Sequence, residues 1–175
     1  DQILPNDRVA IATAGEASFN RILRIFGHAP IDFPDKPKVA IFGAGRVGVR
    51  LAKAWLNAGA KVTVVERELE KANNLAGSDI GNMKGIEIIH GDHLDKNLLS
   101  EIEIGSHDIA ISALNDDHAS IAAVLLAIDM GVERTGLILY DADLVNVVRR
   151  MGITFSVDRK RVAIDSILAR IHSEL

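Results

Sequence analysis

The sequence predicts an α/β fold in which helices cover a parallel sheet of about six strands. From Lys38 onward, short β-branched runs alternate with amphipathic stretches of helical length, and a glycine-rich turn follows the first of these runs. Such alternation is typical of parallel strands that are joined by crossover helices. We therefore expect a Rossmann-like, doubly wound sheet.

The expected strands are short apolar runs separated by turns. They cover residues 38–42, 61–65, 87–90, 108–113, 136–140 and 153–157. Helical periodicity is clearest at residues 47–58 and 118–130. Gly59 supplies a stop signal for the first of these helices, because glycine commonly ends a helix.

The first 37 residues have a different pattern. Residues 8–13 alternate like a strand, residues 16–26 are amphipathic, and three prolines follow between residues 30 and 37. A segment below about 40 residues rarely folds unsupported. We expect residues 1–37 to be the tail of an upstream regulatory subdomain plus a linker, and residues 38–175 to form the Rossmann domain. Residues 162–171 predict a terminal helix with an apolar stripe that packs either on the sheet or on another subunit.

Composition excludes several functions. The 175 residues carry a formal charge of -4 and a pI near 5.9, whereas nucleic-acid-binding domains typically have a pI above about 9. The absence of cysteine excludes disulfides and cysteine-ligated zinc, and fits a reducing cytosol. The apolar runs are shorter than the roughly 20 residues that cross a bilayer. We expect no nucleic-acid partner, and a role at a membrane only through another protein.

The expected phosphate-binding turn is Gly43-Ala44-Gly45-Arg46-Val47-Gly48. It follows a predicted strand and opens a predicted helix, which is the context that a dinucleotide-binding glycine motif requires. In that motif Gly43 permits the tight turn, Gly45 leaves room for the pyrophosphate, and Gly48 allows the helix to approach the sheet. Arg46 either binds a terminal phosphate through its guanidinium or remains exposed without contact. A glycine turn without a ligand is the alternative for the whole motif.

Glu66 follows Gly48 by eighteen residues, near the roughly 20-residue spacing at which a carboxylate reaches ribose hydroxyls. A carboxylate there repels a 2'-phosphate, which favours NAD(H) or an adenosine nucleotide over NADP(H). The neighbouring Arg67 opposes this preference, because arginine can pair with a 2'-phosphate. The alternative for Glu66 is a solvated charge at the end of a strand.

Polar residues also follow the third and fourth predicted strands, where open α/β sheets bind ligands. Asp92 follows the third strand, and Asn115, Asp116 and Asp117 follow the fourth. We expect contacts to adenine and ribose from these loops. Alternatively, Asp116 and Asp117 cap the next helix, and for Asp117 the cap is the favoured interpretation.

Catalytic machinery is missing from the sequence pattern. The histidines are scattered over separate loops, where histidines are usually solvated, and only the segment from His90 to His93 offers a weak metal-binding pattern. Nucleophile-elbow and P-loop lysine motifs are absent, and little chain remains for a substrate domain. We therefore expect binding without turnover, no catalytic residue and no metal site. The alternatives are a fragment of an NAD-dependent oxidoreductase and a structural assembly module with a vestigial pocket.

Together these residues resemble the RCK family, the TrkA N-terminal domains that regulate potassium transporters and channels. The resemblance covers residues 38 to about 171. It rests on Val39-Ala40-Ile41-Phe42 with the glycine turn, Val64-Val65-Glu66-Arg67, His90-Gly91-Asp92, Ala113-Leu114-Asn115-Asp116-Asp117 and Met130-Gly131-Val132. Residues 1–37 resemble the end of the small subdomain that follows each such unit, which implies the second nucleotide-binding domain of a tandem regulator.

The resemblance implies a cytoplasmic regulatory subunit that a potassium transporter or channel partner holds at the inner face of the membrane. The effector would be NAD(H), with ATP or ADP as the alternative, and the domains would form a homodimer or tetramer whose change of shape gates ion flux. The residues expected to contact the nucleotide are Gly43, Ala44, Gly45, Arg46, Val47, Gly48, Glu66, Arg67, Asp92, Asn115 and Asp116.

One segment departs from the family pattern. Tyr140-Asp141-Ala142 stands where many relatives carry an arginine, which puts phosphate contacts across subunits in doubt. Asp141 and Asp143 are candidates for a regulatory cation site, and the alternative is a solvated helix start.

Overall fold

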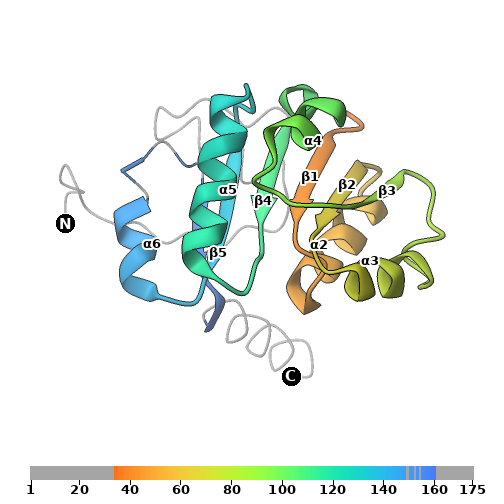
Figure 1. The fold of residues 1–175 in the computed structure, drawn as a ribbon, viewed down its shortest axis with the longest axis horizontal. Coiled ribbons are helices and arrows are strands. Elements are labelled where there is room, and N and C mark those ends of the chain that lie inside the picture. The colour runs from red at the N-terminus through yellow and green to blue at the C-terminus, as the bar shows by residue number, and fades with distance from the viewer. Residues whose placement is uncertain (1–33, 149, 152, 154, 161–175) are drawn as a thin grey trace, which may run out of the picture. The chain divides into compact units, whose positions relative to one another are not determined.

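The computed structural model describes residues 34–148, 150, 151, 153 and 155–160, and this part has the predicted fold (Figure 1). Its strands form one six-stranded parallel sheet in the order β3-β2-β1-β4-β5-β6. The strands are β1 (Lys38–Phe42), β2 (Lys61–Glu66), β3 (Ile86–His90), β4 (Ile109–Ser112), β5 (Thr135–Leu139) and β6 (Phe155–Asp158). The predicted N-terminal arm and terminal helix lie outside the described residues.

Crossover helices cover the sheet on both faces, as a doubly wound topology requires (Figure 1). On one face, α2 (Arg46–Asn57) packs against β1 and β2, and α3 (Leu69–Ala76) packs against β2 and β3. On the other, α5 (Asp117–Asp129) packs against β4 and β5, and α6 (Ala142–Val148) against β5 and β6. The short α4 (Lys96–Glu101) and a 3-10 turn (Ile104–Ser106) lead from β3 back to β4.

The central strands are buried along almost their whole length. In β1, residues 39–42 have no exposed surface, which is expected of a parallel strand that is covered on both faces. Phe42 packs with Val65 from β2, Leu99 from α4 and Ala123 from α5. This shared core fixes the carboxyl ends of β1, β2 and β4 relative to one another.

Some element boundaries differ from the sequence prediction. The sixth strand begins at Phe155 rather than at Ile153, and Ile153 packs instead as a buried loop residue against α6 and β5. Tyr140 was expected to end β5 but lies beyond it. Its backbone N–H donates to the carboxylate of Asp117 rather than to a neighbouring strand.

The three motif glycines meet different steric demands. Gly43 has a φ of +102°, a backbone conformation that side-chain-bearing residues rarely adopt. A Cβ on Gly48 would overlap the carbonyl oxygen of Gly43, whereas a Cβ on Gly45 would meet nothing within 4 Å. Gly48 is therefore required for packing, while the space beside Gly45 stays open. The predicted stop of α2 is also present, since Gly59 has a φ of +89°.

Replacing Gly48 tests this steric assignment. In Gly48→Ala, the new methyl group meets rigid backbone, and we expect the free energy of unfolding to fall by about 3 kcal/mol. The matched control is Gly45→Ala, for which the change should stay below about 1 kcal/mol because only a helix-cap preference is lost. Urea denaturation of both variants measures the difference. Equal stability of the two variants would contradict the assignment.

Candidate functional site

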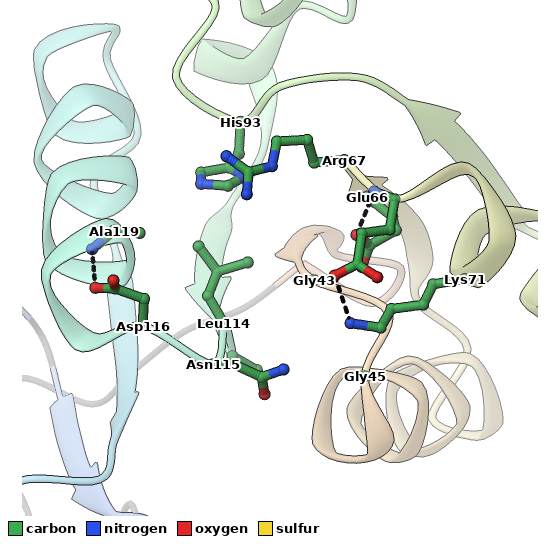
Figure 2. A pocket seen from close by; sticks show the side chains of 12 residues that line it. Gly43, Gly45, Glu66, Arg67, Lys71, His93, Leu114, Asn115, Asp116 and Ala119 are labelled. Carbon is green, nitrogen blue, oxygen red and sulfur yellow. Dashed lines mark hydrogen bonds and ion pairs between the residues drawn. The ribbon is translucent and has the colours of Figure 1, made fainter.

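A pocket of about 210 Å³ lies at the carboxyl ends of the strands, where the strand order reverses between β1 and β4 (Figure 2). Doubly wound sheets bind their ligands at this position. The lining residues come from the loops after β1, β2, β3 and β4 and from the helices that follow. They are Gly43, Gly45, Glu66, Arg67, Glu68, Lys71, His93, Ala113, Leu114, Asn115, Asp116 and Ala119.

Glu66 connects two of these loops. Its side chain is only 6% exposed, and one carboxylate oxygen accepts a hydrogen bond of 2.6 Å from the backbone N–H of Ala44. The other oxygen accepts one of 2.8 Å from the N–H of Glu68. Glu66 is therefore not the solvated strand-end charge that the alternative described. The Ala44 N–H is directed to this carboxylate, which argues against the predicted phosphate contact of Ala44 through that group.

The start of α2 presents unsatisfied donors to the pocket. Gly45 is the N-cap residue, no side chain caps the helix, and its first turn holds no acidic residue. The first N–H groups of a helix have no partner within the helix and carry the positive end of its dipole. An anionic group is therefore favoured here, and the open space beside Gly45 allows its approach.

Three charged residues after β2 form the rim on the opposite side. Lys71, from the first turns of α3, donates a hydrogen bond of 2.7 Å to Glu68. This bond raises the pKa of Lys71, partly offset by burial. Arg67 is exposed and extends across the pocket toward His93 in Figure 2. The rim thus combines two cations with the carboxylates of Glu66 and Glu68.

His93 is a buried wall of the pocket, so the expectation that the loop histidines are solvated is wrong for it. Its side chain is 5% exposed, and its ring centroid lies 6.4 Å from that of Phe42. The Nδ1 atom is buried without a hydrogen-bond partner. Burial lowers the pKa of His93, while the nearby Asp92 carboxylate opposes this effect. His107 is also buried, and its Nε2 atom forms a hydrogen bond of 3.1 Å with the Thr63 hydroxyl.

The two aspartates in the loop after β4 have different hydrogen-bond partners. Asp116 caps α5 by accepting a hydrogen bond of 3.0 Å from Ala119 N–H, which lowers the pKa of Asp116. Asp117 was the favoured cap, and that prediction is wrong. Its carboxylate accepts hydrogen bonds from the N–H groups of Tyr140, at 2.9 Å, and Asp141, also at 2.9 Å. Asp117 thereby holds the loop between β5 and α6.

The predicted nucleotide residues do not all reach this pocket. Those that line it are Gly43, Gly45, Glu66, Arg67, Asn115 and Asp116. Ala44, Arg46, Val47, Gly48 and Asp92 are not among its lining residues. Arg46 and Asp92 are exposed, and Asp92 accepts a hydrogen bond from Leu94 N–H within its own loop.

Sequence reasoning missed Lys71 and His93. The sequence could have indicated Lys71, because a helix that begins shortly after Glu66 and Arg67 places its first residues at the edge of the sheet where β2 ends. His93 had no such signal, because its ring packs against that of Phe42, which is distant in the chain.

Asp141 and Asp143 lie at the start of α6. Asp141 accepts a hydrogen bond of 2.9 Å from Asp143 N–H, and both side chains are exposed. This contact agrees with the helix-start alternative. Within the described ranges, no group of three or more carboxylate or histidine side chains is placed to hold a metal ion.

Comparison with known proteins identifies the family. The sequence model of the TrkA-N domain family matches residues 39–158. The chain belongs to the TrkA-N domain family. The Trk system potassium uptake protein TrkA of Azorhizobium caulinodans is 30% identical over 173 residues, which cover 98% of this chain and 36% of the relative. A TrkA homologue of Archaeoglobus fulgidus is 27% identical, over 92% of this chain and 35% of the relative. This TrkA-N chain thus spans about a third of these relatives.

Solved structures share the fold of this TrkA-N domain. An NAD(P)-binding domain of an exopolyphosphatase-related protein from Archaeoglobus fulgidus superposes with a TM-score of 0.66 at 15% identity, covering 79% of this chain and 99% of that one. The GsuK channel bound to NAD has a TM-score of 0.62 at 18% identity, covering 82% of this chain and 26% of that one. At these identities the comparison establishes the fold alone.

No helix in the described part of the chain is long and apolar enough to cross a membrane.

The depressed pKa of His93 predicts a pH-dependent stability. On acidification, the unfolded chain takes up a proton at His93 near the ordinary histidine pKa of about 6.5, while the folded domain takes it up only at lower pH. This contribution to stability is therefore complete above that range and decreases as the pH falls. We expect His93→Gln to lose less stability between pH 7.5 and pH 5.5 than the unsubstituted chain.

Urea unfolding at both pH values measures the effect. The reference is the unsubstituted chain, unfolded at the same two pH values. If His93→Gln kept the full pH dependence, the depressed pKa would not contribute to stability.

Proposed function

We propose that this TrkA-N domain is a nucleotide-binding regulatory domain of a potassium uptake system. In this proposal, an adenine nucleotide binds in the pocket at the strand-order reversal and changes the relative populations of two assembly states. The domain binds its effector without chemical turnover.

One arrangement carries the proposal: the open, uncapped start of α2 lies beside a buried carboxylate. The space next to Gly45 and the free N–H groups of α2 suit phosphate. Glu66 lines the same pocket, and each of its oxygens keeps a lone pair beyond its backbone hydrogen bond. Ribose hydroxyls donate to such lone pairs. Phosphate and ribose are adjacent in a nucleotide, as these two features are in the pocket.

The proposed ligand is NAD(H), with ADP or ATP as the alternative. A pocket of about 210 Å³ is smaller than the roughly 300–1,000 Å³ that encloses a drug-sized ligand. It therefore suits the adenosine half, with the phosphates at α2 and the remainder of the ligand outside. The carboxylates of Glu66 and Glu68 disfavour a 2'-phosphate, although Arg67 and Lys71 at the same rim reduce this discrimination.

The biological setting is proposed from the relatives, which are named as potassium uptake proteins. We propose that the domain acts in the cytoplasm, at the inner face of the membrane, through a potassium transporter or channel partner. It would assemble as a homodimer or tetramer. The effector then favours the assembly state in which its pocket is better formed. The size of this shift is set by the difference between the effector's affinities for the two states.

Calorimetric titration of the whole chain with NAD, NADH, ADP and ATP tests the proposal. We expect saturable binding to at least one nucleotide, and no change in nicotinamide absorbance over hours with candidate substrates. Gly45→Val should weaken binding by about tenfold or more, because its side chain occupies the phosphate space. Gly45 has extended backbone angles (φ -73°, ψ -176°), which valine adopts readily, so folding should be preserved.

Each other outcome selects a different function. Redox turnover would favour the oxidoreductase alternative. If none of the four nucleotides gave a heat of binding, the structural assembly module would be the remaining interpretation. If Gly45→Val bound as tightly as the unsubstituted chain, the ligand would lie elsewhere. Potassium flux through the reconstituted transporter, measured with and without the bound nucleotide, tests the regulatory step.

A further inference from the structure

We infer that Tyr140 is a positioning residue of the nucleotide site, which turns the Asn115 amide so that its N–H donors face the phosphate groups of the ligand. This inference rests on the proposed function, because it assumes that phosphate occupies the space beside Gly45. It assigns a role to a residue at which this chain departs from the family pattern.

A hydrogen bond joins the two side chains. The Tyr140 hydroxyl donates to Asn115 Oδ1 at 3.2 Å. Asn115 follows β4 and lines the pocket, whereas Tyr140 follows β5, which pairs with β4. Because parallel neighbours end at the same edge of the sheet, this bond reaches the pocket from the adjacent loop.

Two further contacts hold Tyr140 in place, although its side chain is 43% exposed. Its backbone N–H is bound by the Asp117 carboxylate at 2.9 and 3.1 Å. The guanidinium carbon of Arg159, which follows β6, lies 4.4 Å from the centroid of the Tyr140 ring. A guanidinium at this distance over an aromatic face is attractive. The Tyr140 hydroxyl is thus held in place by one contact to the backbone N–H of Tyr140 and by another to the face of its ring.

The chemistry of an amide gives the consequence. A carboxamide has one acceptor oxygen and one nitrogen with two donors. With its oxygen bound to Tyr140, Asn115 turns its nitrogen toward the side of the pocket where Gly45 lies (Figure 2). Phosphate oxygens accept hydrogen bonds and do not donate them. A rotated amide would place its oxygen against a phosphate oxygen, whereas the hydrogen bond from the Tyr140 hydroxyl to Oδ1 keeps the two N–H donors on the pocket side.

Positive charge near the start of α2 also favours phosphate. Arg46 begins α2, and its charge contributes, after burial, to lowering the pKa of Arg159. The two guanidinium groups therefore lie close enough to repel each other, with Asp117 offsetting part of the repulsion. Because Arg46 directly follows Gly45, a phosphate bound there would place negative charge near this guanidinium, whereas a neutral sugar would not.

A double-mutant cycle tests the inference with ADP and adenosine as probes. Tyr140→Phe keeps the ring and the backbone contacts and removes only the hydroxyl. We expect it to weaken ADP binding by about fivefold, the effect of one hydrogen bond, and to leave adenosine binding unchanged. In an Asn115→Ala background, Tyr140→Phe should have no further effect on ADP binding.

The side-chain amide resonances of Asn115 provide a second readout in the protein without nucleotide. If the hydroxyl binds the amide oxygen, Tyr140→Phe shifts these resonances while the urea unfolding midpoint changes little. A role in stability alone would move the midpoint and leave the amide resonances in place.

Several results would overturn the inference. They are an unchanged ADP affinity in Tyr140→Phe, an equal loss in the Asn115→Ala background, and an equal loss for adenosine, which would place Asn115 on the nucleoside. An unsubstituted chain that binds none of NAD, NADH, ADP and ATP would instead refute the proposed function. If that chain binds and the cycle shows no coupling, only the role of Tyr140 fails.

Discussion

The site depends on one buried carboxylate. Glu66 ends β2 beside β1, and its two oxygens bind the N–H groups of Ala44 and Glu68. A buried carboxylate is costly unless hydrogen bonds compensate for its lost hydration. Both bonds are therefore required, and each fixes a loop: one sets the glycine turn, and the other sets the entry into α3. The pocket lies between these two loops.

This double role changes the meaning of the acidic residue in the glycine motif. From its spacing alone, Glu66 is a ribose ligand. In the structure it also shapes the glycine turn, where we propose that phosphate binds, so its removal would disturb both proposed contacts together. A loss of affinity after substitution of Glu66 would not measure a ribose contact. Gly45 is a better probe, because its side-chain position is empty and its backbone angles suit other residues.

The sequence predicted features that depend on local spacing. The six strands follow from β-branched runs between turns, and the roles of Gly43 and Gly48 follow from their places in one short motif. It could not predict contacts between loops. Asp116 and Asp117 are adjacent and chemically identical, yet Asp116 caps α5 while Asp117 binds the loop after β5, more than twenty residues later. His93 was misjudged for a similar reason, since the ring that packs against it belongs to Phe42 at the end of β1.

The loops on the two sides of the strand-order reversal contribute different hydrogen-bonding groups to the pocket. The β2 side supplies the acceptor oxygens of Glu66, whereas the β4 and β5 side supplies the Asn115 amide held by Tyr140. A ligand with hydroxyls at one end and phosphate at the other could contact both sides, as the proposed function requires. Such a ligand also adds a link between two halves of the sheet that otherwise meet through β1 and β4. In the proposed function, a ligand that contacts both loops stabilises their arrangement, and a regulatory domain can transmit this stabilisation to a partner without any chemical step.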